Sequence, residues 1–228
     1  MQCGIIVQAR MSSTRLPQKM LRTLGAQPLI SWVVGRLKAN RSELPVIVAT
    51  SNETSDHQIA EWCQSSQVQV FRGSLDDVQE RYLDCMEHFA LDAAVRVSGD
   101  SPFISPIVVD DAYGIFTKLS PDIDLISNVV NKTYPKGQSV ELFTKNALQR
   151  LSSMSPSIDE REHVTLGFYS RPAEFRIESF DLSQSERHLS FVVDTSSDLE
   201  RLLGFLVAHK EPPLGFEELV RLYKSYQG

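Results

Sequence analysis

IIVQARMSSTRLPQKML, residues 5–21, is the most informative stretch of the sequence. Its short apolar run, residues 5–7, stops at a polar segment, which is typical of a buried strand that delivers its carboxyl end to a site. Arg10, Arg15 and Lys19 follow closely, interleaved with serine and threonine hydroxyls. Guanidinium, ammonium and hydroxyl groups can together surround a polyphosphate. The alternative is an exposed loop whose cations are only solvated.

The residues around this loop alternate between short apolar runs and longer helical patterns. The apolar runs predict strands at residues 5–7, 45–49, 68–71 and 93–97. Helix-length segments lie between them, around residues 29–37, 57–63 and 78–89. This alternation predicts an α/β fold in which helices flank a parallel sheet.

A stretch rich in proline and serine, residues 120–157, interrupts this rhythm. We expect it to be an inserted lid or acceptor-shaping element within a single domain, residues 1–228. The second half then predicts a helix at 160–169, strands at 175–180 and 191–193, and helices at 199–208 and 216–223.

Charged residues follow several of the predicted strands, namely Arg10, Arg72, Asp100 and Asp194. Ligands of such sheets bind at the carboxyl ends of the strands, so we expect these side chains at one edge. Two carboxylates opposite a cationic loop indicate Mg²⁺ shared with a phosphorylated ligand, because Mg²⁺ takes one or two carboxylates and otherwise waters and phosphate oxygens. Taken singly, Asp100 could form a turn before Pro102, and Asp194 could cap a helix.

The composition narrows the classes of partner. A formal net charge of -6 argues against general binding to nucleic acid or to an anionic membrane, and favours a small anionic ligand. Cys3, Cys63 and Cys85 are widely spaced without a CxxC pair, so we expect reduced packing residues. The N-terminus lacks a signal-peptide pattern, and no segment approaches the ~20 apolar residues that span a bilayer. We therefore expect a cytoplasmic protein.

Six motifs carry a resemblance to a known family. In chain order they are ARMSSTRLPQK, FRGSLDDVQERY, VSGDSP, TYPKG, REHVT and VVDTSSDL. Together they resemble the cytidylyltransferase family that activates acidic sugars, particularly its spore-coat-polysaccharide-like branch. Its members include the synthetases for CMP-sialic acid and CMP-3-deoxy-octulosonate. The resemblance implies a three-layer α/β/α sandwich with a mostly parallel central sheet, of the nucleotide-diphospho-sugar transferase type and often a homodimer.

The resemblance also implies a set of nucleotide and metal residues. Asp100 and Asp194 match the family's magnesium-binding aspartates, and Arg72 lies where the family places residues near the base and sugar. The implied catalytic residues are Arg15, Lys19 and Asp100. The implied nucleotide-binding residues are Ala9, Arg10, Ser13, Arg15, Lys19, Arg72 and Ser98.

Three further residues are candidates for binding the acceptor. Arg161 and His163, in the REHVT motif, could meet an acceptor carboxylate and the sugar, or form a surface cluster on a helix. Glu141 alternates with apolar neighbours as on a strand, and could face either the acceptor pocket or solvent.

The function that follows is the activation of an acidic sugar with CTP, which gives a CMP-sugar and pyrophosphate and requires Mg²⁺. Three residues depart from the family pattern: Gln18 replaces a common Gly, and Gln138 and Ser139 replace Leu and Asp. These departures leave open another nucleotide or a non-acidic acceptor such as a polyol phosphate. A non-catalytic nucleotide-binding subunit of a glycan pathway is a third interpretation.

Overall fold

The apolar run near the N-terminus forms an interior strand of the main sheet. In the computed structural model, which describes residues 1–227, this strand is β1 (Cys3–Gln8). It pairs in parallel with β4 (Val46–Ser51) on one side and β6 (Ala93–Ser98) on the other. β5 (Gln69–Gly73) pairs in parallel with β4. The four strands predicted in the first half of the chain are therefore confirmed. The last residue of the predicted domain, Gly228, lies outside the described residues.

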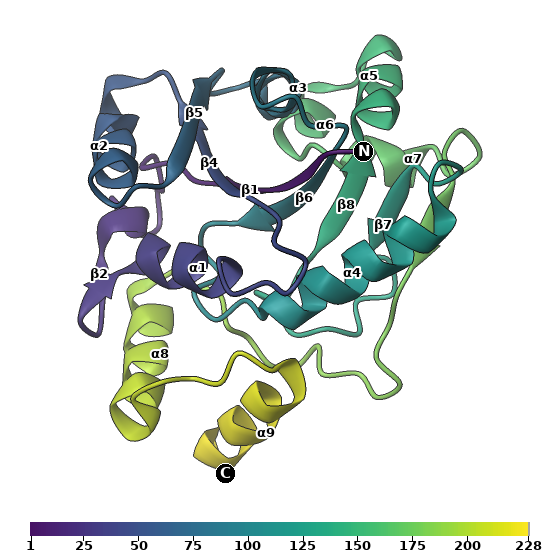
Figure 1. Ribbon diagram of the computed structural model, residues 1–228. Helices are drawn as coiled ribbons and strands as arrows, with labels where there is room; N and C mark the ends of the chain where they lie inside the picture. Colours follow the sequence, from purple (N-terminus) through teal and green to yellow (C-terminus); the bar gives the residue numbers. More distant parts are fainter. Residues whose placement is uncertain (228) are drawn as a thin grey trace.

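The second half of the chain completes a seven-stranded sheet of order β5-β4-β1-β6-β8-β7-β9 within the described residues (Figure 1). β8 (Glu141–Thr144) is antiparallel to β6 and to β7 (Leu125–Ser127). β9 (Ile177–Ser179) is parallel to β7. Most strand pairs are parallel, as predicted. β7, β8 and α5 come from the stretch that we expected to form a lid, and residues 120–124, 128–140 and 154–157 of that stretch lie outside strands and helices.

Helices cover both faces of the sheet, which makes three layers. α1 (Leu29–Leu37) and α4 (Pro106–Leu119) lie on one face, and α3 (Val78–His88) and α5 (Lys145–Ser153) lie on the other (Figure 1). A short hairpin pairs β2 (Thr23–Leu24) with β3 (Gln27–Pro28). The remaining helices of the described residues are η1 (Lys19–Leu21), η2 (Thr54–Asp56), α2 (His57–Ser65), α6 (Ile158–Glu162), α7 (Leu166–Ser170), α8 (Ser196–His209) and α9 (Phe216–Gln227).

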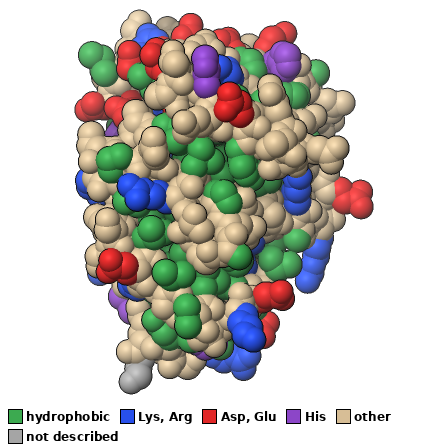
Figure 2. Space-filling view, turned by 90° about the vertical axis from the view of Figure 1, so that its left-hand side faces the viewer, with side chains coloured by type: hydrophobic (Ala, Val, Ile, Leu, Met, Phe, Trp, Pro, Cys, Tyr) green, Lys and Arg blue, Asp and Glu red, His purple; other side chains and the backbone are tan. Residues whose placement is uncertain are grey.

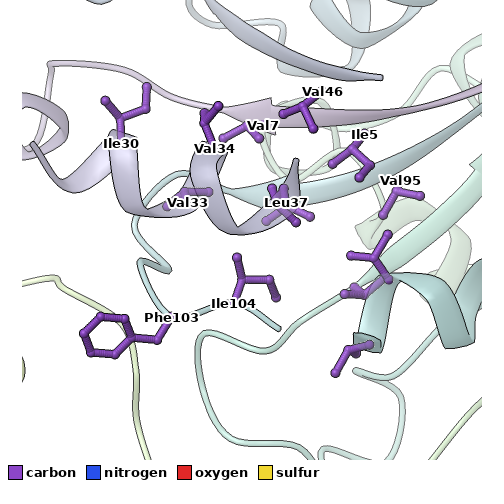
Figure 3. Close-up of a cluster of buried hydrophobic side chains, with 14 of the residues drawn as sticks. Ile5, Val7, Ile30, Val33, Val34, Leu37, Val46, Val95, Phe103 and Ile104 are labelled. Atoms are coloured by element: carbon purple, nitrogen blue, oxygen red, sulfur yellow. The ribbon is translucent and has the colours of Figure 1, made fainter. Parts of the chain in front are cut away.

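Successive side chains of a strand point to opposite faces of the sheet, so the hydrophobic core consists of two clusters, one on each face. Ile5 and Val7 of β1 contact the cluster that includes Val33 and Leu37 of α1, whereas Ile6 belongs to the cluster beneath α3 and α5. Figure 3 shows the first of these clusters between the sheet and α1. A strand that is apolar on both faces, as β1 is, must be covered on both.

Two predicted elements of the second half are wrong in detail. The predicted helix at 160–169 is divided into α6 and α7 by a turn in which Val164 has a φ of 35°. The predicted strand at 191–193 is not a strand. Its backbone instead bonds to loops, because Phe191 N donates to Lys136 O and Val193 N donates to Asp100 O. The second of these bonds attaches the segment before α8 to the end of β6.

The three cysteines pack as predicted. Cys3, Cys63 and Cys85 are buried and free, and burial raises the pKa of each thiol to about 12. No helix within residues 1–227 has the length and apolarity that crossing a membrane requires. On the face that carries β2 and α8, apolar side chains lie among charged ones (Figure 2), and Leu203 and Val207 of α8 are exposed. The homodimer stays a prediction.

Candidate active site

A polar cavity opens where β1 and β6 end. Its volume is about 420 Å³. It is lined by Gln8, Arg10, Ser12, Ser13, Thr14, Arg15, Lys19, Met20, Ser98, Asp100, Glu162, His163 and Asp194. Residues from four separate parts of the chain therefore meet at the carboxyl edge of the parallel strands, where ligands of such sheets bind.

The loop after β1 is held by a buried carboxylate that we did not predict as a site residue. Asp56 is fully buried and accepts hydrogen bonds from Met11 N (2.7 Å) and from Ser51 N (3.1 Å). Its Oδ2 also accepts from Ser51 Oγ at 2.5 Å. Asp56 thus ties the cationic loop to the end of β4. Gln18 ends the loop with a φ of 57°, a conformation that glycine adopts more readily.

Lys19 brings the two predicted metal ligands together. Its Nζ donates to Asp100 Oδ2 at 3.1 Å and to Asp194 Oδ1 at 3.0 Å. Arg15 Nη2 lies 3.2 Å from Asp194 Oδ2. Because one ammonium contacts both carboxylates, they converge on a single cation position. Two converging carboxylates are the donors that Mg²⁺ prefers when waters and phosphate oxygens complete its shell, so this pair fits Mg²⁺.

Close backbone packing sets this geometry. A Cβ on Gly99 would lie 2.9 Å from Gln8 O and 2.9 Å from Met20 Sδ, so only glycine lets the end of β6 approach the loop this closely. On the other side, Asp198 Oδ2 accepts from Asp194 N at 3.1 Å and closes a capping box with Thr195. Burial alone would raise the pKa of Asp198. The hydrogen bonds from Thr195, Asp194 N and Arg201 outweigh burial, so the net shift of this pKa is downward.

The charged side chains of the REHVT segment have different surroundings. Glu162, which we did not predict, lines the cavity, and its Oε1 lies 3.1 Å from Arg10 Nη2. His163 lines the cavity as well. Arg161 instead pairs with Asp77 at 2.5 Å, at the start of α3. Only part of the motif therefore faces the cavity.

Two other predicted residues, Arg72 and Ala9, do not line the cavity. Arg72 Nε and Nη2 donate to the carbonyls of Ser51 and Glu53, both at 2.9 Å. Ala9 is buried, and its N–H donates to Ala49 O. Neither lines the cavity. Ser98, in contrast, does.

Of the two environments that we considered for Glu141, the structure excludes the solvent-facing one. It is 3% exposed, so a position on a solvent-facing side of the strand is wrong, and it does not line the cavity. Its carboxylate pairs with Arg96 Nη1 and accepts from Tyr169 Oη, both at 2.5 Å. Gln138, one of the departures from the family pattern, is also fully buried and bonds to Phe103 O and Ser105 N. It holds the segment after Asp100.

Comparison with known proteins gives a consistent result. The family model described as Cytidylyltransferase matches residues 4–225. The spore coat polysaccharide biosynthesis protein SpsF of Bacillus subtilis is 29% identical over 225 residues, which cover 95% of this chain and 92% of SpsF. A 3-deoxy-manno-octulosonate cytidylyltransferase of Pseudomonas fluorescens is 31% identical over 111 residues, 46% of this chain and 42% of that protein.

Solved structures share the fold. A cytidylyltransferase from Leptospira borgpetersenii superposes with a TM-score of 0.93 at 29% identity, over 100% of this chain and 95% of that one. A CMP:2-keto-3-deoxy-manno-octonic acid synthetase complexed with CTP has a TM-score of 0.71 at 19% identity, over 92% of this chain and 100% of that one. At that identity the second match concerns the fold alone.

Proposed function

The chain belongs to the cytidylyltransferase family, and we propose that it transfers CMP from CTP to an acidic sugar and releases pyrophosphate, in the synthesis of a surface polysaccharide. The observation that carries the proposal is the convergence of Lys19, Asp100 and Asp194 beside the cationic loop. The names of two relatives support the proposal: one is a protein of spore coat polysaccharide biosynthesis, which supports the pathway, and the other is a cytidylyltransferase for 3-deoxy-manno-octulosonate, an eight-carbon acidic sugar, which supports the acceptor class.

In the reaction, a hydroxyl of the sugar attacks the α-phosphate of CTP, a P–O bond forms, and the bond to the β-phosphate breaks. Catalysis of such a transfer consists mainly of positioning and charge neutralisation. Arg15 and Lys19 would bind the phosphates that leave as pyrophosphate. To do so, each must exchange its carboxylate partner for phosphate oxygens, and Lys19 would then vacate the position between Asp100 and Asp194.

Asp100 and Asp194 would hold Mg²⁺ at that position. Bound there, Mg²⁺ would neutralise phosphate charge and lower the pKa of the attacking hydroxyl. Arg10 would turn from Glu162 toward the nucleotide. Ser13 already accepts from Leu16 N at 3.3 Å, which shapes the loop for binding through its backbone N–H groups.

The test is pyrophosphate release with Mg²⁺. CTP, UTP, ATP and GTP are each offered with eight- and nine-carbon acidic sugars, and with neutral sugars and polyol phosphates as controls. We expect release only with CTP and an acidic sugar. Release with another pair would overturn the substrate assignment, and CTP binding without any turnover would favour a non-catalytic subunit.

One observation favours the second candidate, a non-acidic acceptor. Within residues 1–227, every lysine and arginine that lines the cavity is already paired with a carboxylate, and the loop cations are the groups that the triphosphate would take. A carboxylate on the acceptor would need a further donor. The same assay separates the two candidates, because a neutral acceptor would then support turnover.

A further inference from the structure

A cation that the sequence did not suggest lies on β6 next to the cavity: Arg96 is not itself a lining residue, but Ser98 on the same strand is. Arg96 is two residues before Ser98 on β6, so both side chains project from the same face of the sheet, about 6.6 Å apart along the strand. Ser98 is exposed and lines the cavity. β6 is paired on both edges, by β1 and β8, so Arg96 can be accessible only through that face. Its side chain is 23% exposed.

One end of the Arg96 guanidinium is fixed. Nη1 pairs with Glu141 Oε2, and Glu141 Oε1 accepts from Tyr169 Oη, which lies 2.7 Å from Ser127 Oγ. Burial and the Glu141 carboxylate raise the pKa of Tyr169, so the phenol stays protonated and donates. Burial would lower the pKa of Arg96, but Glu141 more than offsets this and the net shift is upward. The guanidinium is therefore charged and its plane is held.

Within residues 1–227, the other end of the guanidinium has no hydrogen-bond partner. Nε is buried without a hydrogen bond, and among the described residues only Nη1 is bonded. Nε and Nη2 form the side edge of the group, and their two parallel N–H bonds match the two oxygens of a carboxylate. An unpaired buried donor is costly, so this edge is suited to a ligand that supplies the acceptors.

The other arginines around the site do not offer such an edge. Arg81 also has Nε and Nη2 unpaired among the described residues, but the whole Arg81 residue is buried, whereas the Arg96 side chain is 23% exposed. Arg161, the cation that the sequence suggested for this role, is paired with Asp77. Arg10 and Arg15 belong to the loop that would bind the triphosphate.

We propose that Arg96 is a specificity-determining residue that binds the carboxylate of the acceptor sugar through its Nε–Nη2 edge, oriented from behind by Glu141 and Tyr169. This inference rests on the proposed function, since it names the group that would recognise an acidic acceptor. A neutral sugar would leave the edge unpaired, and sites that hold unpaired buried donors reject such analogues strongly.

The test measures binding without requiring turnover. The probes are 3-deoxy-manno-octulosonate and a nine-carbon acidic sugar, each compared with its methyl ester by titration calorimetry on protein saturated with a non-hydrolysable CTP analogue. Wild type should bind an acid about 10- to 100-fold more tightly than its ester, as expected for a charge-assisted bidentate contact. Arg96→Lys keeps a partner for Glu141 but loses the fork, and should bind acid and ester within about threefold of each other.

Arg161→Lys is the matched control and should keep the full preference for the acid. The proposal is overturned if Arg96→Lys keeps the preference, if Arg161→Lys abolishes it, or if wild type shows none. Should Arg96→Lys fail to fold, the double variant Arg96→Met/Glu141→Gln removes both charges and should lose the preference in the same way. Pyrophosphate release by wild type, measured separately, tests the proposed function, so a failure of either is distinguishable from a failure of the other.

Discussion

The cavity has two sides that differ in how the chain builds them. The phosphate side is the loop of residues 10–19, which directly follows β1 in the sequence. The side that we propose for the acceptor comes from segments far apart in the sequence: the turn after α6, which lines the cavity, and Arg96 on β6 and Glu141 on β8, which lie next to it. The first side is a local arrangement of cations. The second is a set of long-range ion pairs, each of which depends on its partner.

Asp100 lies between the two sides, so its loss should have the largest effect. Asp100→Asn removes one of the two carboxylates around Lys19, and we expect pyrophosphate release to fall about 100- to 1,000-fold because charge at the α-phosphate is no longer neutralised. The measurement is the initial rate at saturating CTP and Mg²⁺, with circular dichroism as the control for folding. An undiminished rate would contradict the assignment of the Asp100 carboxylate as a Mg²⁺ ligand.

The Lys19→Met variant tests whether the Lys19 ammonium competes with Mg²⁺ for the carboxylates of Asp100 and Asp194. Lys19→Met removes the ammonium from between Asp100 and Asp194, so we expect nucleotide-free protein to bind Mg²⁺ about 10-fold more tightly, while turnover falls about 100-fold. Calorimetric titration with MgCl₂ measures the first effect. Lys38→Met, at an exposed position on the end of α1, should change neither. Weaker Mg²⁺ binding by Lys19→Met would show that Lys19 supports the site rather than competing for it.

Glu162 should give a smaller effect of opposite sign. Its pair with Arg10 is between side chains that are 42% and 38% exposed, and exposed pairs contribute little. Glu162→Gln releases Arg10 for the triphosphate, so the dissociation constant of CTP should fall by about two- to fivefold. Asp159→Asn, on the same short helix but outside the cavity, is the comparison. If Glu162→Gln weakened CTP binding, Glu162 would belong to the nucleotide site itself.

Gln18 should give the smallest effect, on stability alone. Gln18→Gly relieves a left-handed conformation and should raise the free energy of unfolding by about 0.5–1 kcal/mol. Gln64→Gly, at an exposed position inside α2, should lower it by about 1 kcal/mol. Urea denaturation compares the two. A destabilised Gln18→Gly would mean that the Gln18 side chain makes a contribution larger than its backbone cost.

Much of the fold was predictable because its signals are local. Apolar runs such as residues 5–7 and 93–97 are short and bounded by polar loops, and buried parallel strands require that pattern. The positions of the loop cations and Asp100 followed as well, since parallel strands bring their carboxyl ends to one edge. The predicted strand at 191–193 failed because apolar residues are also buried by loops, here against Lys136 and Asp100.

What the sequence determined by itself was the alternation of strands and helices, the cationic loop and the charged residues that follow the strands. The tertiary structure alone decided which charges meet. Lys19 contacts Asp100 and Asp194, which are 81 and 175 residues away, and Arg10 contacts Glu162, which is 152 residues away. It also turned Glu141 inward to Arg96 and left one edge of that guanidinium without a hydrogen-bond partner in the part of the chain that the structure describes. The physical reason is that periodicity is set by each residue's near neighbours, whereas an ion pair requires two distant segments to be packed into place by the same sheet.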